Sequence, residues 1–445
     1  MTSGKILPEL IKFSIPLILT GVLQQLYNTA DILVAGNFGG KAALAAVGAT
    51  TSLINILVNV FINIFIGTNI LVARSVGAKD DDMLRKVVST TYIVSLVMGV
   101  GVMVFGELLT VPLLKLTGCP DNVINGAETY MRIYLIGVPA SVFMNFASSV
   151  IRNSGDSRTP FVYLSLSGLT NVVCNVFFVL ITGNAVVSVA IATVVSMYLS
   201  AVLFFIYMVR MDGPCKLYPF KWDYRGVILL KTIRYGIPAV ISSVSFSLTN
   251  VIIQPAINAY GDVGISASAA AASIEAFMYA INNAFMAAVV AFVGQNIGAG
   301  NRERVGKVLK TSYLTAVSVM AVFTVVMIGF GREILWFYIP GETEAIEFAR
   351  LRLTVIMSAA VINGIMNVNA GALQAYGYTS LQMITNLIGV CVFRVIWMLV
   401  IYPLSVTPLM LWICYPISWV TTCAAMFIIV MVLTRKYVKG KDFKL

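Results

Sequence analysis

The chain has 445 residues, of which 59% are hydrophobic and only 11% are charged, and its formal net charge is +11. A soluble domain carries about 25% charged residues, so this composition excludes an ordinary soluble protein and favours one that is surrounded by lipid. The sequence has no histidine, which removes the commonest metal ligand and the usual proton relay near neutral pH. Its six cysteines are not spaced as metal ligands.

Twelve apolar runs follow one another along the chain, each long enough to cross a bilayer, which takes about 20 mostly apolar residues. They are too long for barrel strands, and only helices or closed barrels satisfy the backbone in lipid, so we predict an all-α integral membrane protein. The first run is too long for a signal-peptide core and lacks a clear cleavage signal, so we expect it to be retained. The predicted spans are 13–36, 44–72, 87–112, 127–150, 159–181, 185–209, 231–258, 265–293, 308–331, 346–372, 380–403 and 409–433.

The basic residues predict the orientation of these spans. With both termini inside the cell, 23 of the 30 Lys and Arg residues fall on inner segments and six on outer segments, and Arg394 falls inside a span. Cytoplasmic loops carry such an excess, so we expect both termini to lie on the cytoplasmic side of an inner or plasma membrane. The net charge then indicates contact with lipid headgroups rather than nucleic acid. Aromatic residues between the sixth and seventh spans predict an interfacial belt: Tyr218, Phe220, Trp222 and Tyr224.

The sequence contains two copies of a six-span unit. A shift of about 222 residues places Ile11–Pro16 on Ile233–Pro238, and a shift of 221 places Val76–Ala78 on Ile297–Ala299. Because each copy has an even number of spans, both enter the membrane in the same orientation, and the symmetry axis should run along the membrane normal.

This duplication predicts the domain organisation. We expect an N-terminal six-helix lobe at 1–210, a cytoplasmic linker at 211–230 and a C-terminal six-helix lobe at 231–445, related by a pseudo-two-fold axis. Parallel repeats of this kind occur in secondary transporters, where the substrate site lies between the halves near the midplane. A duplicated structural membrane protein is the alternative.

Two acidic residues lie inside predicted spans, Asp31 in span 1 and Glu275 in span 8. A charged group at a helix centre costs about 2.5–3.5 kcal/mol on insertion scales, so it usually faces a cavity or a partner. Each is therefore a candidate proton or cation site. Asp31 could instead lie at the outer interface, and Glu275 could make a structural hydrogen bond. Neither acid is repeated, since Asp31 aligns with Ile253 and Glu275 with Leu53.

Two prolines and several amides complete the candidate site. Pro16 and Pro238 occupy matching positions near the start of spans 1 and 7, where proline acts either as a simple helix-entry kink or as a hinge. Asn171 and Asn175 lie one helical turn apart, and with Thr193 they could supply neutral oxygens beside Asp31 or make interhelical hydrogen bonds. Other polar residues in the spans are candidates for lining a cavity: Gln25, Asn28, Asn363 and Asn367.

Taken together, these segments resemble the multidrug and toxic compound extrusion (MATE) family, in its prokaryotic form, over essentially the whole chain. The resemblance rests on Gln24–Asp31, Val76–Lys79, Ile151–Asp156, Asn171–Asn175 and Ala190–Thr193. It implies twelve helices in two lobes around a central cleft, and export of organic cations in exchange for protons or sodium.

The resemblance also implies roles for individual residues. Asp31 matches the aspartate of the family's helix 1, and Pro16 matches its bending proline. Some prokaryotic members add an Asn-x-x-x-Asp pair on helix 5 and a threonine on helix 6. Asn171 and Thr193 match these positions, but Asn175 replaces the second aspartate, which argues against a strong sodium site. Span 10 has no interior acid, unlike another branch of the family, and Glu275 resembles the carboxylate of the C-terminal lobe.

The sequence therefore predicts a secondary active antiporter that exports amphipathic, cationic drugs or toxic compounds by alternating access. The expected coupling ion is the proton, with sodium at Asp31 as the alternative. We expect a monomer in contact with membrane lipids and small organic cations, with no enzyme activity, cofactor, nucleotide, nucleic acid or other metal. One alternative is a lipid-linked oligosaccharide flippase, against which twelve spans and a single intramembrane arginine, Arg394, argue. The other is a receptor or scaffold that transports nothing.

Overall fold

The computed structural model describes residues 1–117 and 119–440, and within 41–62 and at 121–122 it describes the backbone but not every side chain. None of the described residues lies in a β-strand, and the predicted all-α class is confirmed. Three of the basic residues counted above, Lys41, Lys441 and Lys444, have side chains outside the described part.

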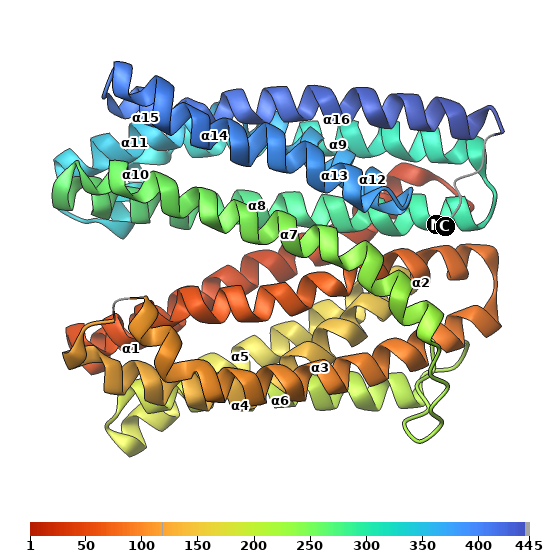
Figure 1. Ribbon diagram of the computed structural model, residues 1–445, viewed down its shortest axis with the longest axis horizontal. Coiled ribbons are helices and arrows are strands. Elements are labelled where there is room, and N and C mark those ends of the chain that lie inside the picture. Colours follow the sequence, from red (N-terminus) through yellow and green to blue (C-terminus); the bar gives the residue numbers. More distant parts are fainter. Residues whose placement is uncertain (118, 441–445) are drawn as a thin grey trace. The chain divides into compact units, whose positions relative to one another are not determined.

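The helices are drawn in Figure 1 and their bounds are as follows: α1 (Ile6–Ile64), α2 (Ile66–Ala78), α3 (Asp81–Leu116), α4 (Asp121–Ser154), α5 (Arg158–Thr182), α6 (Ala185–Arg210), α7 (Gly226–Asn258), α8 (Gly261–Gly298), α9 (Arg302–Gly329), α10 (Gly331–Tyr338), α11 (Thr343–Ser358), α12 (Ala360–Ala375), α13 (Thr379–Asn386), the π-helical η1 (Leu387–Val392), α14 (Phe393–Ile396), the π-helical η2 (Trp397–Ile401), the 3-10 turn η3 (Tyr402–Leu404), α15 (Pro408–Trp412) and α16 (Cys414–Val438).

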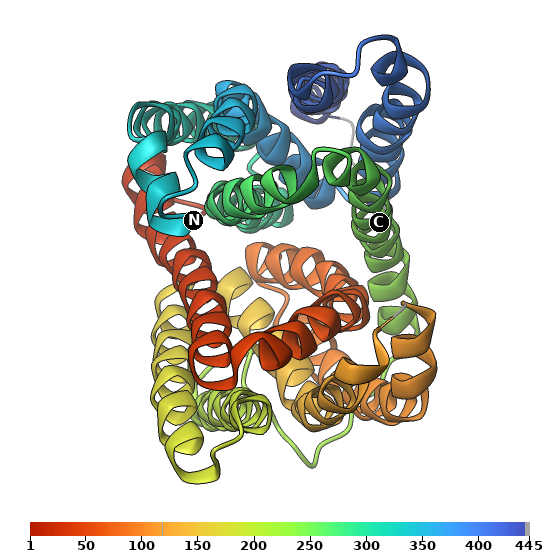
Figure 2. The same ribbon diagram turned by 90° about the vertical axis from the view of Figure 1, so that its left-hand side faces the viewer.

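Ten helices or helix runs of the described part are long and apolar enough to cross a membrane, and the bent pair α11 and α12 makes an eleventh. The predicted span 44–72 falls on the second arm of α1 and on α2, where many side chains are not described. This second arm begins at Gly40, whose φ of 66° favours glycine and breaks the helix. Figure 2 shows the red and orange-red ribbon of α1 bent into two arms. Gly40 thus separates the first two predicted spans.

Two predicted spans contain marked irregularities. Span 346–372 is broken at Ala359 between α11 and α12, which meet at 48°. Span 380–403 contains the π-helical turns η1 and η2, which widen the helix locally. Gly389 in η1 lies so close to α16 that a Cβ atom there would stand 2.2 Å from the Thr422 hydroxyl oxygen.

The chain divides into two compact units, each described here by itself. The N-terminal unit consists of Ile15–Val240, and the C-terminal unit consists of Met1–Ser14 together with Ile241–Leu445. Both dividing points lie within two residues of a matched proline, Pro16 in α1 and Pro238 in α7. The first residues of α1 therefore belong to the C-terminal unit, and the first residues of α7 belong to the N-terminal unit.

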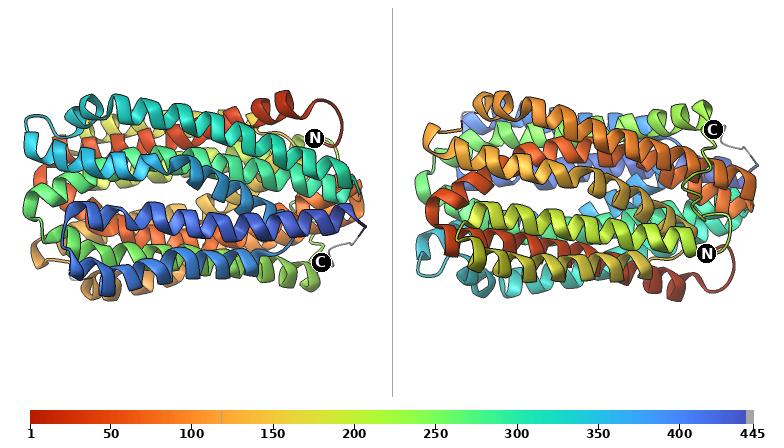
Figure 3. Two further views of the ribbon diagram at one scale, coloured as in Figure 1. Left: turned by 90° about the horizontal axis from the view of Figure 1, so that it is seen from above. Right: turned by 90° about the horizontal axis from the view of Figure 1, so that it is seen from below.

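In the N-terminal unit, α4 packs against α3 on one side and α6 on the other, and α5 packs against α6. Figure 3, in its right-hand view, shows α3, α4 and α6 side by side. Phe65 and Phe146 meet in the buried core with ring centroids 6.3 Å apart. The first turns of α7 approach α2 closely, because a Cβ atom on Gly67 would lie 2.3 Å from the carbonyl oxygen of Thr232.

In the C-terminal unit, α8 is the central helix and packs against α9, α11 and α12. The first residues of the chain belong to this unit. Phe13 packs edge-on against Phe292 of α8 with ring centroids 5.6 Å apart. Arg304 donates hydrogen bonds to the carbonyl oxygens of Ser3 (2.6 Å) and Gly4 (3.0 Å), which fixes the N-terminal segment on α9.

Candidate functional site

The candidate site of the N-terminal unit centres on Asp31, in the first arm of α1. The amide nitrogen of Asn175 donates a 2.5 Å hydrogen bond to Asp31 Oδ1. Asn175 is fully buried on α5, whereas Asp31 is half-buried. Among the described residues, no Lys or Arg forms an ion pair with Asp31. The carboxyl group is therefore held by a neutral amide inside an apolar helix bundle.

A chain of hydrogen bonds continues from Asp31 across two further helices. Asn175 also donates to Asn171 Oδ1 over 3.2 Å, and Asn171 donates to the Thr193 hydroxyl of α6 over 3.3 Å. Thr193 itself donates to the carbonyl oxygen of Val189. Asn175 Oδ1 is buried without a hydrogen-bond partner in the described part of the chain. The network thus retains one free acceptor next to an acid.

The turn between α5 and α6 explains why these side chains meet. Gly183 ends α5 with a φ of 66°, and Asn184 then caps α6 by accepting a 3.2 Å hydrogen bond from the amide of Val187. The two helices therefore run antiparallel with their polar residues in register. Asn171 and Asn175 lie one turn apart on α5 and so share a face.

Tyr27 positions Asp31 against α5. Its hydroxyl donates to the carbonyl oxygen of Ser165 (3.2 Å). Its ring packs directly on Gly168, where an added Cβ atom would lie only 1.8 Å from Tyr27 Cε2. Only glycine at 168 permits this approach. Asp31 lies one helical turn after Tyr27, so the packed ring sets the position of the carboxyl group.

The C-terminal unit holds its buried acid differently. Arg352 Nε and Nη2 donate to the two carboxylate oxygens of Glu275 over 2.7 and 2.9 Å, and both side chains are buried. The guanidinium of Arg352 also lies 4.6 Å from the ring centroid of Trp412. This two-point ion pair neutralises Glu275.

Arg352 corrects the sequence analysis on two counts. It was counted with the outer segments, but only 6% of its surface is exposed, inside the bent span of α11 and α12. Arg394 is therefore not the only intramembrane arginine. The sequence does carry a signal that distinguishes Arg352 from Arg350. Arg350 lies 3.7 Å from Glu347, one turn earlier on the same helix, whereas Arg352 has no acidic residue one turn away on its own helix.

Arg394 is fully buried among aromatic rings. Its guanidinium lies 3.9 Å from the ring centroid of Tyr415, and its Nε donates to the Ser418 hydroxyl over 3.1 Å. Its two terminal nitrogens have no hydrogen-bond partner among the described residues. The rings of Phe246 and Trp419 lie at about 6 Å. The interior of this unit thus holds two arginines against one glutamate.

The remaining predicted residues do not join the Asp31 network through any hydrogen bond of the described residues. Asn363 is buried, accepts a 2.7 Å hydrogen bond from Asn282 and a 3.0 Å hydrogen bond from Asn367, and so links α12 to α8. Gln25 is half-buried and Asn28 is exposed on α1, and Pro16 and Pro238 are both buried. Within the described residues, no cluster of three or more Cys, Asp or Glu side chains could hold a metal ion.

The long apolar helices are those of a polytopic membrane protein, and comparisons with known proteins give its class. The MatE family model matches residues 16–177 and again 238–400, so the two matches begin at Pro16 and Pro238, 222 residues apart. The chain therefore belongs to the MatE family, whose members are transporters and not enzymes.

The chain is similar to a curated relative, and its fold matches two solved structures. The chain is 27% identical to "Probable multidrug resistance protein YoeA" of Bacillus subtilis, over 82% of this chain and 80% of the relative. A solved MATE structure in the bent conformation superposes with a TM-score of 0.90 at 20% identity, covering 98% of this chain and 97% of that one. A structure in the straight conformation gives 0.89 at 20% identity, covering 98% of both chains.

Proposed function

We propose that this protein is a secondary active antiporter that exports amphipathic, cationic compounds in exchange for protons across a cell membrane, with both termini in the cytoplasm. The observation that carries the proposal is Asp31, an intramembrane acid held by Asn175 without a cationic partner. Such a group can take up one proton or one cationic substrate, but not both at once. The names of curated relatives, which include probable multidrug resistance proteins, support drugs as the substrate class.

The arrangement at Asp31 favours a proton over sodium as the coupling ion. Asn175 presents its N–H group to the carboxylate, so the amide must turn over before its oxygen could help bind sodium. The other carboxylate oxygen of Asp31 could accept a proton without any such movement. Asn175 also replaces a second acid, so a single positive charge neutralises the site.

We propose that the two units are the lobes that move during alternating access. The chain passes from one unit to the other beside Pro16 in α1 and beside Pro238 in α7. Proline lacks the amide hydrogen that would complete the helix ladder, so a helix bends more readily there. Relatives with a bent and a straight conformation support bending as the mode of movement.

Dye efflux from proteoliposomes tests this function. We expect an imposed proton gradient to drive efflux and a sodium gradient of equal size at constant pH to have no effect. Asp31→Asn should reduce proton-driven efflux to the level of empty liposomes. Asp262→Asn is the matched control, because Asp262 is exposed at the start of α8. Full proton-driven efflux by Asp31→Asn would reject the mechanism, and failure to move any compound from a broad cation panel would reject the function.

A further inference from the structure

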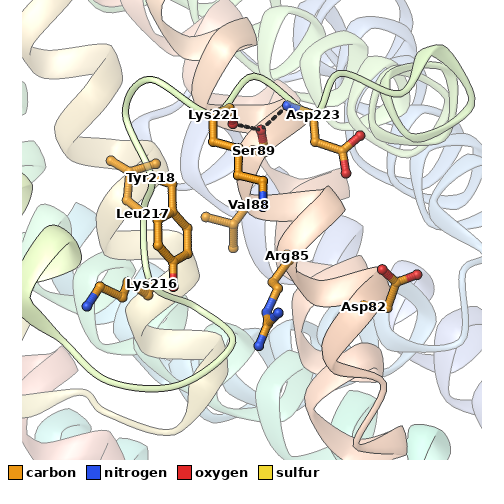
Figure 4. Close-up of a pocket in the computed structure, with 9 residues that line it drawn as sticks. All are labelled: Asp82, Arg85, Val88, Ser89, Lys216, Leu217, Tyr218, Lys221 and Asp223. Atoms are coloured by element: carbon orange, nitrogen blue, oxygen red, sulfur yellow. Dashed lines mark hydrogen bonds between the residues drawn. The ribbon is translucent and has the colours of Figure 1, made fainter.

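The linker between α6 and α7 forms a polar site of its own, within the N-terminal unit and apart from the Asp31 network. It docks on the first turns of α3. The Ser89 hydroxyl donates to the carbonyl oxygen of Lys221 (3.4 Å) and accepts from the amide of Asp223 (3.0 Å), as Figure 4 shows. Thr90 accepts a further 3.1 Å hydrogen bond from the amide of Arg225. The linker therefore has a defined path over α3.

A pocket of about 290 Å³ lies between this linker and α3. Three basic side chains line it: Arg85 from α3, and Lys216 and Lys221 from the linker. Figure 4 shows Arg85 on the helix side and Lys216 on the linker side. None of the three forms an ion pair with a described residue.

The two acids that line the pocket form their ion pairs with other cations. Asp82 is paired with Lys86 one turn further along α3. Asp223 is paired with Arg225 at 2.8 Å. Lys86 and Arg225 are not part of the pocket lining. Asp82 also attracts Arg85 electrostatically, but Arg85, Lys216 and Lys221 form no ion pair with a described residue, and the pocket lining has more basic than acidic side chains. This excess of positive charge suits a ligand with a compact negative charge.

Exposed aromatic rings adjoin these charges on the same linker. Phe220 is 97% exposed, Trp222 is 69% exposed and Tyr218, which also lines the pocket, is 49% exposed. The linker follows the last residue of α6 and contacts the first turns of α3, and both helices are candidate membrane spans. Aromatic and basic side chains at the end of a span are typical of the membrane interface.

We propose that the pocket between the linker and α3 binds the phosphate group of an anionic phospholipid. Arg85, Lys216 and Lys221 surround the phosphate, and Phe220 and Trp222 lie among the headgroups and the first acyl carbons. A bound lipid then holds the linker on α3. A water-soluble phosphate has the same charge but makes no use of the aromatic rings, so a lipid accounts for more of the site. This proposal is independent of the transport function.

The test uses the purified full-length chain in a neutral detergent, titrated with dioctanoyl phosphatidylglycerol or dioctanoyl phosphatidylcholine, with binding followed by native mass spectrometry. We expect selective binding of phosphatidylglycerol. A basic side chain near an anionic lipid surface contributes about 1 kcal/mol, or about fivefold in affinity, so Lys216→Gln with Lys221→Gln should weaken binding about 25-fold. Lys216→Arg with Lys221→Arg should preserve it and shows that the linker remains folded.

Lys115→Gln is the matched control, because Lys115 is an exposed lysine at the opposite end of α3. It should bind phosphatidylglycerol as the unmodified chain does. Equal affinity of the unmodified chain and the double glutamine variant, or equal affinity for the two lipids, overturns the proposal.

A second arm separates the two sources of phosphate. Phe220→Ser with Trp222→Ser should weaken binding of phosphatidylglycerol, and sn-glycerol 3-phosphate should bind far more weakly than the lipid to every form. If sn-glycerol 3-phosphate binds as tightly as phosphatidylglycerol, the lipid assignment is overturned and the pocket takes a soluble phosphate compound.

Discussion

The two units hold their buried acids in opposite ways. Asp31 in the N-terminal unit accepts a hydrogen bond from a neutral amide, whereas Glu275 in the C-terminal unit is bound at both oxygens by Arg352. A carboxylate that is paired with arginine is already neutralised, so it has little tendency to take up a proton. A carboxylate that is held only by amides is neutralised when it takes up a proton. The duplicated scaffold thus carries two differently held acids, and from this difference we propose ion exchange at Asp31 and a positioning role for Glu275.

The largest effect should follow from Arg352→Leu, which breaks the ion pair and leaves Glu275 buried without a partner. Removing one member of a buried pair costs about 3–5 kcal/mol, so we expect a large fall in the melting temperature of the purified chain. Replacing both residues, Glu275→Leu with Arg352→Leu, should restore most of the stability and retain proton-driven efflux. A stable double variant without efflux would show that Glu275 takes part in coupling, which would break the comparison.

A smaller change should follow from Asn175→Asp, which places a second acid next to Asp31. Two adjacent carboxylates resist simultaneous ionisation and offer more oxygen ligands to a cation. We expect a sodium gradient to stimulate efflux by this variant about tenfold, equivalent to about 1.4 kcal/mol, with no such response in the unmodified chain. Asn145→Asp is the control, because among the described residues the side chain of Asn145 bonds only to the carbonyl oxygen of Ser141 on its own helix. The same sodium response in both variants would contradict this account.

The smallest effect should come from Thr193→Val at the far end of the network. The substitution keeps the side-chain shape but removes the acceptor of a 3.3 Å hydrogen bond from Asn171. Such a bond contributes about 1 kcal/mol, so the initial rate of proton-driven efflux should fall about fivefold. Thr193→Ser keeps the hydroxyl and should transport at the original rate. Equal losses in both variants would mean that packing, rather than the hydrogen bond, is responsible.

Much of the fold can be predicted from the sequence because span length and apolar composition follow from the thickness of the bilayer. The breaks within spans could not. Ala359 carries no proline or glycine signal, and the π-helical turns from Leu387 to Ile401 depend on contacts with α16, such as Gly389 on Thr422. The passage of the chain between units beside Pro16 and Pro238 is likewise a property of tertiary packing.

The site of the N-terminal unit was predictable because its residues combine polarity, helical spacing and a family resemblance. Asp31, Asn171, Asn175 and Thr193 form one connected network. The partner of Glu275 was not predictable, because Arg352 lies 77 residues away and hydrophobic periodicity does not identify tertiary neighbours. Predicted spans alone could not show which arginine is buried.

The most direct test of the central claim is to measure proton release when substrate binds. The purified chain in weakly buffered detergent near pH 7 is mixed with a cationic dye substrate, and a pH indicator reports released protons. We propose that one acid serves both ligands, and so we predict release of up to one proton per bound dye by the unmodified chain and none by Asp31→Asn, with Glu275→Gln still releasing protons. Undiminished release by Asp31→Asn would contradict the account.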